Sequence, residues 1–170
     1  MTKDDIINLL RFKKIEFDVV EHEPFFSVAD SQKYRNKIKG SHSKNLFLKN
    51  KKNNFFLISC EENENINLKK ISKSLGLGNV SFAKQELLFS YLKIEPGSVS
   101  PFALLNDQNN EVIFYLEKKL YESEFINFHP LVNIFTITLP TSSFLKFMIE
   151  NNKKINIFSS DQGEIIKSYE

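Results

Sequence analysis

Two apolar segments on either side of a short polar stretch constrain the fold of this chain more than any other feature. Residues 44–49 contain the run Leu-Phe-Leu, and residues 55–60 are almost entirely apolar. Residues 50–54 between them are lysines and asparagines. This pattern is typical of a β-hairpin with a polar tip. The chain is therefore expected to build part of its core on an antiparallel pair of strands.

The rest of the chain supplies further helices and short strands in irregular order. Helices are expected where apolar residues recur at helical spacing, over residues 3–13, 27–38, 67–75, 84–92 and 141–151. Strands are expected over residues 17–21, 80–83, 103–106, 112–116, 125–128, 134–139 and 155–158. This order indicates an α/β mixed (α+β) fold, with a largely antiparallel central sheet surrounded by helices, and not a doubly wound parallel sheet.

Length and composition fit one soluble domain. The chain has 170 residues, of which 41% are hydrophobic and 26% are charged, so residues 1–160 can bury a sizeable core as a single domain. Residues 161–170 are expected to form a flexible, frayed tail. The acidic start of the chain has no long apolar run behind it, and no stretch approaches the roughly 20 apolar residues of a membrane span. We therefore expect a cytoplasmic protein with no membrane segment.

The sequence lacks the motifs of several common chemistries. It has no phosphate-binding glycine fingerprint and no Gly-x-Ser-x-Gly elbow of a serine esterase. Zinc sites need clustered ligands, whereas His22, His42, His129 and Cys60 are scattered along the chain. Cys60 is the one cysteine and ends an apolar strand, so we interpret it as a core residue in a reducing compartment and not as a nucleophile. Neither a metal nor a cofactor is expected.

Three polar groups remain as candidates for a site. In residues 97–101, Gly97 and Pro101 shape the backbone, so that the amides between them are free to point at a ligand. Residues 41–45 bring a lysine and an asparagine to the entrance of a strand. In residues 127–133, a histidine precedes a proline and therefore adopts an extended backbone. Taken alone, each group favours a structural role: a tight turn, an exposed loop and a buried histidine respectively.

Five motifs in one order change this interpretation. They are Lys-Asn-Leu-Phe-Leu-Lys at 44–49, Leu-Gly-Leu-Gly at 75–78, Ser-Phe-Ala at 81–83, Gly-Ser-Val-Ser-Pro-Phe-Ala-Leu-Leu-Asn-Asp at 97–107 and Asn-Phe-His-Pro-Leu-Val-Asn at 127–133. Together they resemble the YbaK/ProX superfamily, whose domain is also the editing domain of bacterial prolyl-tRNA synthetase. The last two motifs resemble the ProXp-ala (PrdX) branch of freestanding deacylases.

The resemblance implies a fold, an activity and a set of site residues. The implied fold is a mixed α/β sheet with surrounding helices, and the implied activity is hydrolysis of the ester between a mischarged amino acid, alanine in this branch, and tRNA(Pro), without a metal or cofactor. The implied catalytic residues are Lys44, Gly97 and His129. The implied substrate-binding residues are Asn45, Ser98, Val99, Ser100, Pro101, Phe102 and Asn127. Ala103 departs from the family pattern, which has glycine there.

The resemblance also implies partners and leaves alternatives open. The implied partner is tRNA(Pro) charged with the wrong amino acid, with prolyl-tRNA synthetase as a candidate second partner. The net charge of +2 does not itself demand a nucleic acid, but a local basic face can bind one. The basic residues expected to meet the tRNA are Lys33, Arg35, Lys37, Lys39, Lys49, Lys51 and Lys52. The alternatives are a Cys-tRNA(Pro) deacylase of the sister branch, a non-catalytic module that binds tRNA or a synthetase, and a binder of free amino acids or peptides.

Overall fold

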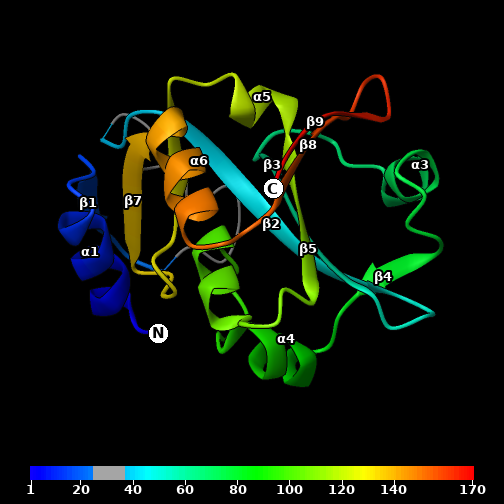
Figure 1. Cartoon of the computed structure of the whole chain (residues 1–170), viewed down its shortest axis with the longest axis horizontal. Coiled ribbons are helices and arrows are strands. Elements are labelled where there is room, and N and C mark those ends of the chain that lie inside the picture. The colour runs from blue at the N-terminus through cyan, green and yellow to red at the C-terminus, as the bar shows by residue number, and fades with distance from the viewer. Residues whose placement is uncertain (25–36) are drawn as a thin grey trace.

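The structure is a computed structural model, and it describes residues 1–24 and 37–170 (Figure 1). The helices are α1 (Lys3–Phe12), α3 (Leu68–Ser74), α4 (Gln85–Leu92), the 3-10 helix η1 (Pro101–Asn106), α5 (Lys118–Tyr121) and α6 (Thr141–Glu150). The strands are β1 (Asp18–Glu21), β2 (Ser41–Asn50), β3 (Phe55–Glu61), β4 (Val80–Phe82), β5 (Val112–Glu117), β6 (Phe125–Phe128), β7 (Phe135–Pro140), β8 (Ile155–Ser159) and β9 (Glu164–Tyr169). Within the described ranges, no helix is long and apolar enough to cross a membrane.

The strands form one mixed sheet with β2 near its centre. The order is β1-β7-β6-β2-β3-β5-β8-β9, and β4 pairs with β2 beside this path. Antiparallel pairs join β1 to β7, β2 to β3, β2 to β4, β6 to β7 and β8 to β9. Parallel pairs join β2 to β6, β3 to β5 and β5 to β8. The predicted mixed α/β fold with a largely antiparallel sheet is therefore confirmed. The parallel pairs join strands that lie far apart in the chain, which the sequence analysis did not predict.

The β2–β3 hairpin is confirmed, and its polar tip explains where the strands turn. Its ladder ends at the pair Lys49↔Phe55. The side-chain oxygen of Asn50 accepts hydrogen bonds from the amides of Lys52 and Asn54, at 2.9 and 3.0 Å, which closes the turn. Because β2 already begins at Ser41, all of residues 41–45 lie within the strand and not at its entrance.

One face of the sheet carries the main apolar core. Phe102 lies at its centre and packs edge-to-face on Phe128, Phe144 and Phe147, with ring centroids 5.8 to 6.1 Å apart. Helices α1, α4, η1 and α6 supply buried side chains to this core, and Figure 1 shows α6 lying across the strands. A smaller cluster on the other face joins Leu48 and neighbours in β3 to side chains of α3.

Two segments differ from the prediction. Residues 103–106 were expected as a strand but belong to η1, because Ser100 caps the helix by accepting a hydrogen bond from the Phe102 amide at 3.3 Å and Pro101 takes its first position. Residues 161–170 were expected as a frayed tail but contain β9, which pairs with β8 from Ile155↔Tyr169 to Ser159↔Glu164. The helix predicted over residues 27–38 lies almost entirely outside the described residues.

Candidate active site

The face of β6 and β7 that turns away from the main core is polar. Asn127 in β6 pairs with His42 in β2 on one side and with Thr138 in β7 on the other, so the three side chains stand in a row across the sheet. Two residues further along each chain come Lys44 and His129, which project to the same face because strand side chains alternate with a period of two. The register therefore places Asn127 beside His42, with Lys44 and His129 two residues further along from them.

Hydrogen bonds fix the orientation of Asn127, which is buried. Its side-chain nitrogen donates to the Lys39 carbonyl at 2.9 Å, and its side-chain oxygen accepts from the Thr138 hydroxyl at 2.6 Å. The Ser43 hydroxyl donates to the Asn127 carbonyl at 2.9 Å. These bonds tie β6 to β7 and to the chain entering β2, so Asn127 organises the row as well as contributing polar atoms to it.

His129 has a defined proton position. Its Nδ1 lies 2.8 Å from the Phe135 carbonyl, and because a carbonyl only accepts, Nδ1 carries the proton. Burial lowers the pKa of His129, which favours the neutral ring near pH 7 and leaves Nε2 as the atom with the lone pair. The site therefore contains an oriented neutral imidazole that can accept a hydrogen bond from a substrate or a water molecule.

The other two histidines lie close to His129, which sequence reasoning missed. The ring centroids of His22 and His129 are 5.8 Å apart. His22 bonds the Thr136 hydroxyl and the Glu23 carbonyl, each at 2.8 Å, and burial lowers its pKa. Nε2 of His42 is buried and has no hydrogen-bond partner in the described part of the chain. The signal available in the sequence was the alternation of His42 and Lys44, which places both on one face of a strand.

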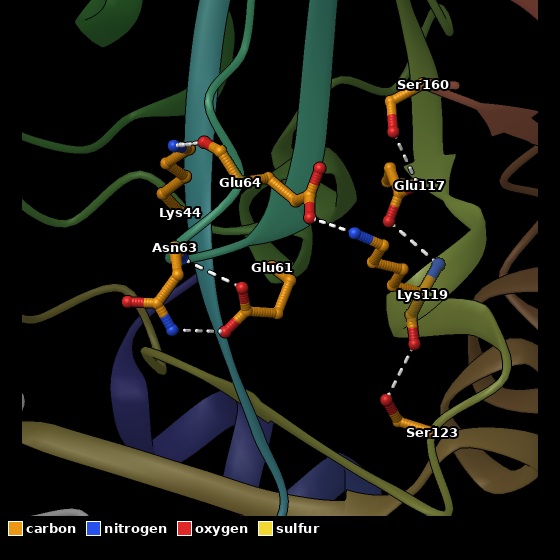
Figure 2. Close-up of polar contacts among 8 residues, drawn as sticks. All are labelled: Lys44, Glu61, Asn63, Glu64, Glu117, Lys119, Ser123 and Ser160. Atoms are coloured by element: carbon orange, nitrogen blue, oxygen red, sulfur yellow. Dashed lines mark hydrogen bonds and ion pairs between the residues drawn. The ribbon is translucent and has the colours of Figure 1, made fainter.

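Lys44 projects from this face toward the loop that follows β3. Its ammonium donates to the main-chain carbonyl of Glu64, as Figure 2 shows. Its strand partner is Cys60, and burial raises the pKa of the Cys60 thiol to about 12. The thiol therefore stays protonated, which agrees with the prediction that it is a core residue and not a nucleophile. Among residues 1–24 and 37–170, no group of three side chains suited to hold a metal ion is found.

Asn45 lies on the opposite face of β2 from Lys44. Its side-chain oxygen accepts a hydrogen bond of 2.5 Å from the Ser59 hydroxyl, and Ser59 is fully buried. Its side-chain nitrogen lies 3.4 Å from the Ser43 hydroxyl. Neighbours in sequence thus point apart, so the structure does not bring Asn45 and Lys44 together.

The loop from Gly97 to Ser100 lies beside the segment that connects β6 to β7. Gly97 has φ +87°, and a Cβ there would lie 3.2 Å from the side-chain nitrogen of Asn133, four residues after His129. The Ser98 amide donates to the Glu95 carbonyl at 3.2 Å. The amides of Val99 and Ser100 donate to no acceptor that the described ranges contain. Ser100 is fully buried, so the Val99 amide is the loop's available donor, although no hydrogen bond joins this loop to Lys44 among the described residues.

The remaining predicted loop residues have internal positions. Pro101 is buried at the start of η1, and Phe102 is fully buried in the aromatic core, where its side chain contacts other rings. Ala103, the departure from the family pattern, is also fully buried. The structure thus gives Phe102 a place in the core beneath the loop and not at its surface.

The basic residues expected to meet tRNA are dispersed. Lys51 and Lys52 are exposed at the tip of the β2–β3 hairpin. Lys39 forms an ion pair with Asp18 at 3.1 Å and lies 4.4 Å above the Phe125 ring. Lys33 and Arg35 lie outside the described residues. The hairpin tip therefore offers the clearest exposed positive charge of this set.

Comparison with known proteins supports the resemblance seen in the sequence. A family model described as an aminoacyl-tRNA editing domain matches residues 22–147. "Prolyl-tRNA synthetase associated domain-containing protein 1" of Bos taurus is 37% identical over 139 residues, which cover 79% of this chain and 81% of that protein. "Prolyl-tRNA editing protein ProX" of Acetoanaerobium sticklandii is 31% identical over 150 residues, which cover 88% of this chain and 92% of that protein.

A solved structure shares the fold. It is described as a "putative trans-editing enzyme for prolyl tRNA synthetase", and it matches with a TM-score of 0.65 at 14% identity over 90% of this chain and 93% of its own. The family model covers most of the chain and includes Lys44, the Gly97 loop and His129. The chain belongs to the aminoacyl-tRNA editing domain family.

Proposed function

We propose that this protein is a trans-editing aminoacyl-tRNA deacylase that hydrolyses the ester of mischarged tRNA(Pro), with Ala-tRNA(Pro) as its substrate. The observation that carries the proposal is the polar face of the sheet, where His42 and Asn127 pair across β2 and β6 and where Lys44 and His129 follow them by two residues. The match to the aminoacyl-tRNA editing domain and the similarity to a prolyl-tRNA editing protein support the class of substrate.

The reaction needs a positioned water more than a strong nucleophile, because an aminoacyl ester is already activated. Water adds to the ester carbonyl carbon, and the carbonyl oxygen gains negative charge. The bond from that carbon to the ribose oxygen then breaks, and the proton from water passes to the ribose oxygen. The products are the free amino acid and tRNA with its terminal hydroxyl restored.

Lys44 and the Gly97 loop supply the electrostatic part of this mechanism. The Lys44 ammonium offers a positive charge to the developing oxyanion or to the terminal phosphate. The amide of Val99, which has no acceptor among the described residues, is a further candidate donor. Donors aimed at an oxyanion often contribute about 100-fold or more to the rate of acyl transfer.

His129 supplies an oriented acceptor. With Nδ1 bonded to the Phe135 carbonyl, Nε2 can accept a hydrogen bond from the attacking water or from the amino group of the substrate. The free hydroxyl of the terminal ribose can help to orient the water, so no strongly basic side chain is required. Selection of alanine would rest on pocket size, and because one methylene changes binding by only about 1–3 kcal/mol, a separate editing site is useful.

The test is deacylation of Ala-tRNA(Pro) by the wild type and by Lys44→Ala, with Cys-tRNA(Pro) and correctly charged Pro-tRNA(Pro) measured beside it. We expect fast release of alanine, spared proline, and a loss of about 100-fold in Lys44→Ala. Lys146→Ala is the control, because this exposed lysine lies on α6. Equal rates for the wild type and Lys44→Ala would contradict the proposal.

The same panel separates the alternatives. Preferential release of cysteine would assign the protein to the sister activity. Binding of tRNA without release of any amino acid would identify a non-catalytic module. A binder of free amino acids or peptides would show no tRNA affinity that weakens with salt, whereas a deacylase that contacts several phosphates loses affinity steeply as salt rises.

A further inference from the structure

A chain of charged contacts links Lys44 to helix α5 (Figure 2). The Lys44 ammonium bonds the main-chain carbonyl of Glu64, and the carboxylate of the same Glu64 bonds the ammonium of Lys119. Glu64 lies in the loop after β3, and Lys119 lies in α5, so the two partners of Glu64 come from different parts of the fold. One residue therefore offers Lys44 a neutral oxygen while its negative charge is held elsewhere.

The position of the Glu64 carboxylate matters because it belongs to the residue that already contacts Lys44. An ammonium and a carboxylate in close contact attract each other strongly where solvent screening is reduced. The Glu64 side chain is only 19% exposed, so screening at this position is limited. Because the Lys44 ammonium already contacts the main chain of Glu64, a carboxylate released from Lys119 would lie on the same residue as a partner of this cation. Such a pair would neutralise the charge that the substrate needs.

The backbone of Lys119 is anchored, which fixes the start of its side chain. Its amide donates to the Glu117 carboxylate at 2.7 Å, and the Ser160 hydroxyl donates to the other Glu117 oxygen at 3.0 Å. Glu117 is 1% exposed. The Lys119 carbonyl accepts a hydrogen bond from the Ser123 hydroxyl at 2.7 Å. Both main-chain polar groups of Lys119 are therefore held by hydrogen bonds, which fixes where its side chain begins.

We propose that Lys119 is a positioning residue that holds the Glu64 carboxylate away from Lys44, so that the Lys44 ammonium stays available to anionic groups of the substrate. The inference rests on the proposed deacylase function. It gives α5 a role in the reaction although Lys119 itself does not touch the reacting atoms.

The test is a pair of substitutions with a second-site rescue. Lys119→Met removes the charge but keeps a long side chain, and we expect kcat/KM for Ala-tRNA(Pro) to fall about tenfold as Glu64 pairs with Lys44. Adding Glu64→Gln to this variant removes the competing carboxylate, so the double variant should recover. Glu64→Gln alone and Lys119→Arg should stay near the wild type. Lys118→Met is the matched control, because Lys118 pairs with Glu122 on the surface of α5.

A second readout follows Lys44 without turnover. Acetylation of lysine side chains by acetic anhydride, read by mass spectrometry, should label Lys44 less in Lys119→Met and as in the wild type in the double variant. A Lys119→Met variant with unchanged rate and labelling would overturn the inference. A double variant no more active than Lys119→Met would also overturn the inference, because a contact that serves only the fold would be lost in both variants. A wild type that hydrolyses no ester but shows this labelling pattern would contradict the proposed function alone.

Discussion

The two faces of the central sheet differ in chemistry although the same strands build both. On one face, β6 and β7 contribute Phe128, Ile137 and other apolar side chains to an aromatic core closed by helices. On the other face, the alternate residues of the same strands are polar and include the buried Asn127 and Thr138. Burying polar groups costs free energy unless each is hydrogen-bonded, so a sheet that only had to be stable would not need the second pattern.

The polar face also contains a buried group that has no hydrogen-bond partner among the described residues. Asn127 and Thr138 bond each other, and Thr136 bonds His22. In contrast, Nε2 of His42 is buried without a partner in the described ranges. Unpaired buried groups are uncommon in proteins and call for an explanation such as a ligand or a water. The apolar face thus contributes packing to stability, whereas the polar face keeps a buried nitrogen that the described residues do not satisfy.

The largest expected effect breaks the apolar face at its centre. Phe102→Ala should lower the free energy of unfolding by about 3–5 kcal/mol, because it removes a fully buried ring and leaves a cavity. Chemical denaturation monitored by circular dichroism measures the change. Phe12→Ala is the control, since Phe12 is 83% exposed, and should change stability little. A loss below about 1 kcal/mol for Phe102→Ala would contradict its central role in the core.

The next effect addresses the polar face and should change the rate more than the stability. His129→Gln keeps a donor for the Phe135 carbonyl but removes the neutral imidazole that presents Nε2. We expect kcat to fall about 100-fold, the lower range for loss of an oriented acid–base group. Deacylation of Ala-tRNA(Pro) measures the rate, and denaturation checks the fold. An unchanged rate would remove His129 from the mechanism.

Local elements were predictable because hydrophobic periodicity reports burial directly. Strand β3 and the helices α1, α4 and α6 lie within one residue of their predicted ranges, whereas β2 begins three residues before its predicted range. The strand expected at 103–106 was wrong because the capping of η1 by Ser100 and Pro101 outweighs a short apolar run. β9 was missed because its exposed residues form a strand only through pairing with β8, which no local pattern reveals.

The site was predictable only where a motif carried it. Lys44, Asn127 and His129 were named through the resemblance to a family. His22 and His42 were dismissed as scattered, because their approach to His129 depends on the pairing of β2 with β6 and of β1 with β7. Non-local register of this kind is set by the whole fold and leaves no spacing in the sequence.

A smaller effect tests whether the Gly97 loop belongs with the polar face. Gly97→Ala places a Cβ 3.2 Å from Asn133 at a φ of +87°, so it should cost about 1 kcal/mol of stability and displace the loop. Gly76→Ala is a matched control, because Gly76 has φ +65° and open space around its Cβ position. We expect similar losses of stability but a tenfold lower kcat/KM only in Gly97→Ala, about the effect of losing one aligned contact. Equal activities would separate the loop from the site.

The smallest expected effect is a dependence of stability on pH that comes from the histidines of the polar face. Burial lowers the pKa of both His22 and His129, whereas the unfolded chain takes up protons near the ordinary value of about 6.5. The stability that these two neutral histidines contribute is therefore fully present above about pH 6.5. It is lost as the pH falls from there toward their lower folded pKa values. Urea denaturation between about pH 7.5 and about pH 5.5 should show the loss, and His129→Gln should show a shallower one. An identical pH profile in His129→Gln would mean that His129 is protonated as readily in the folded chain as in the unfolded one, which its burial argues against.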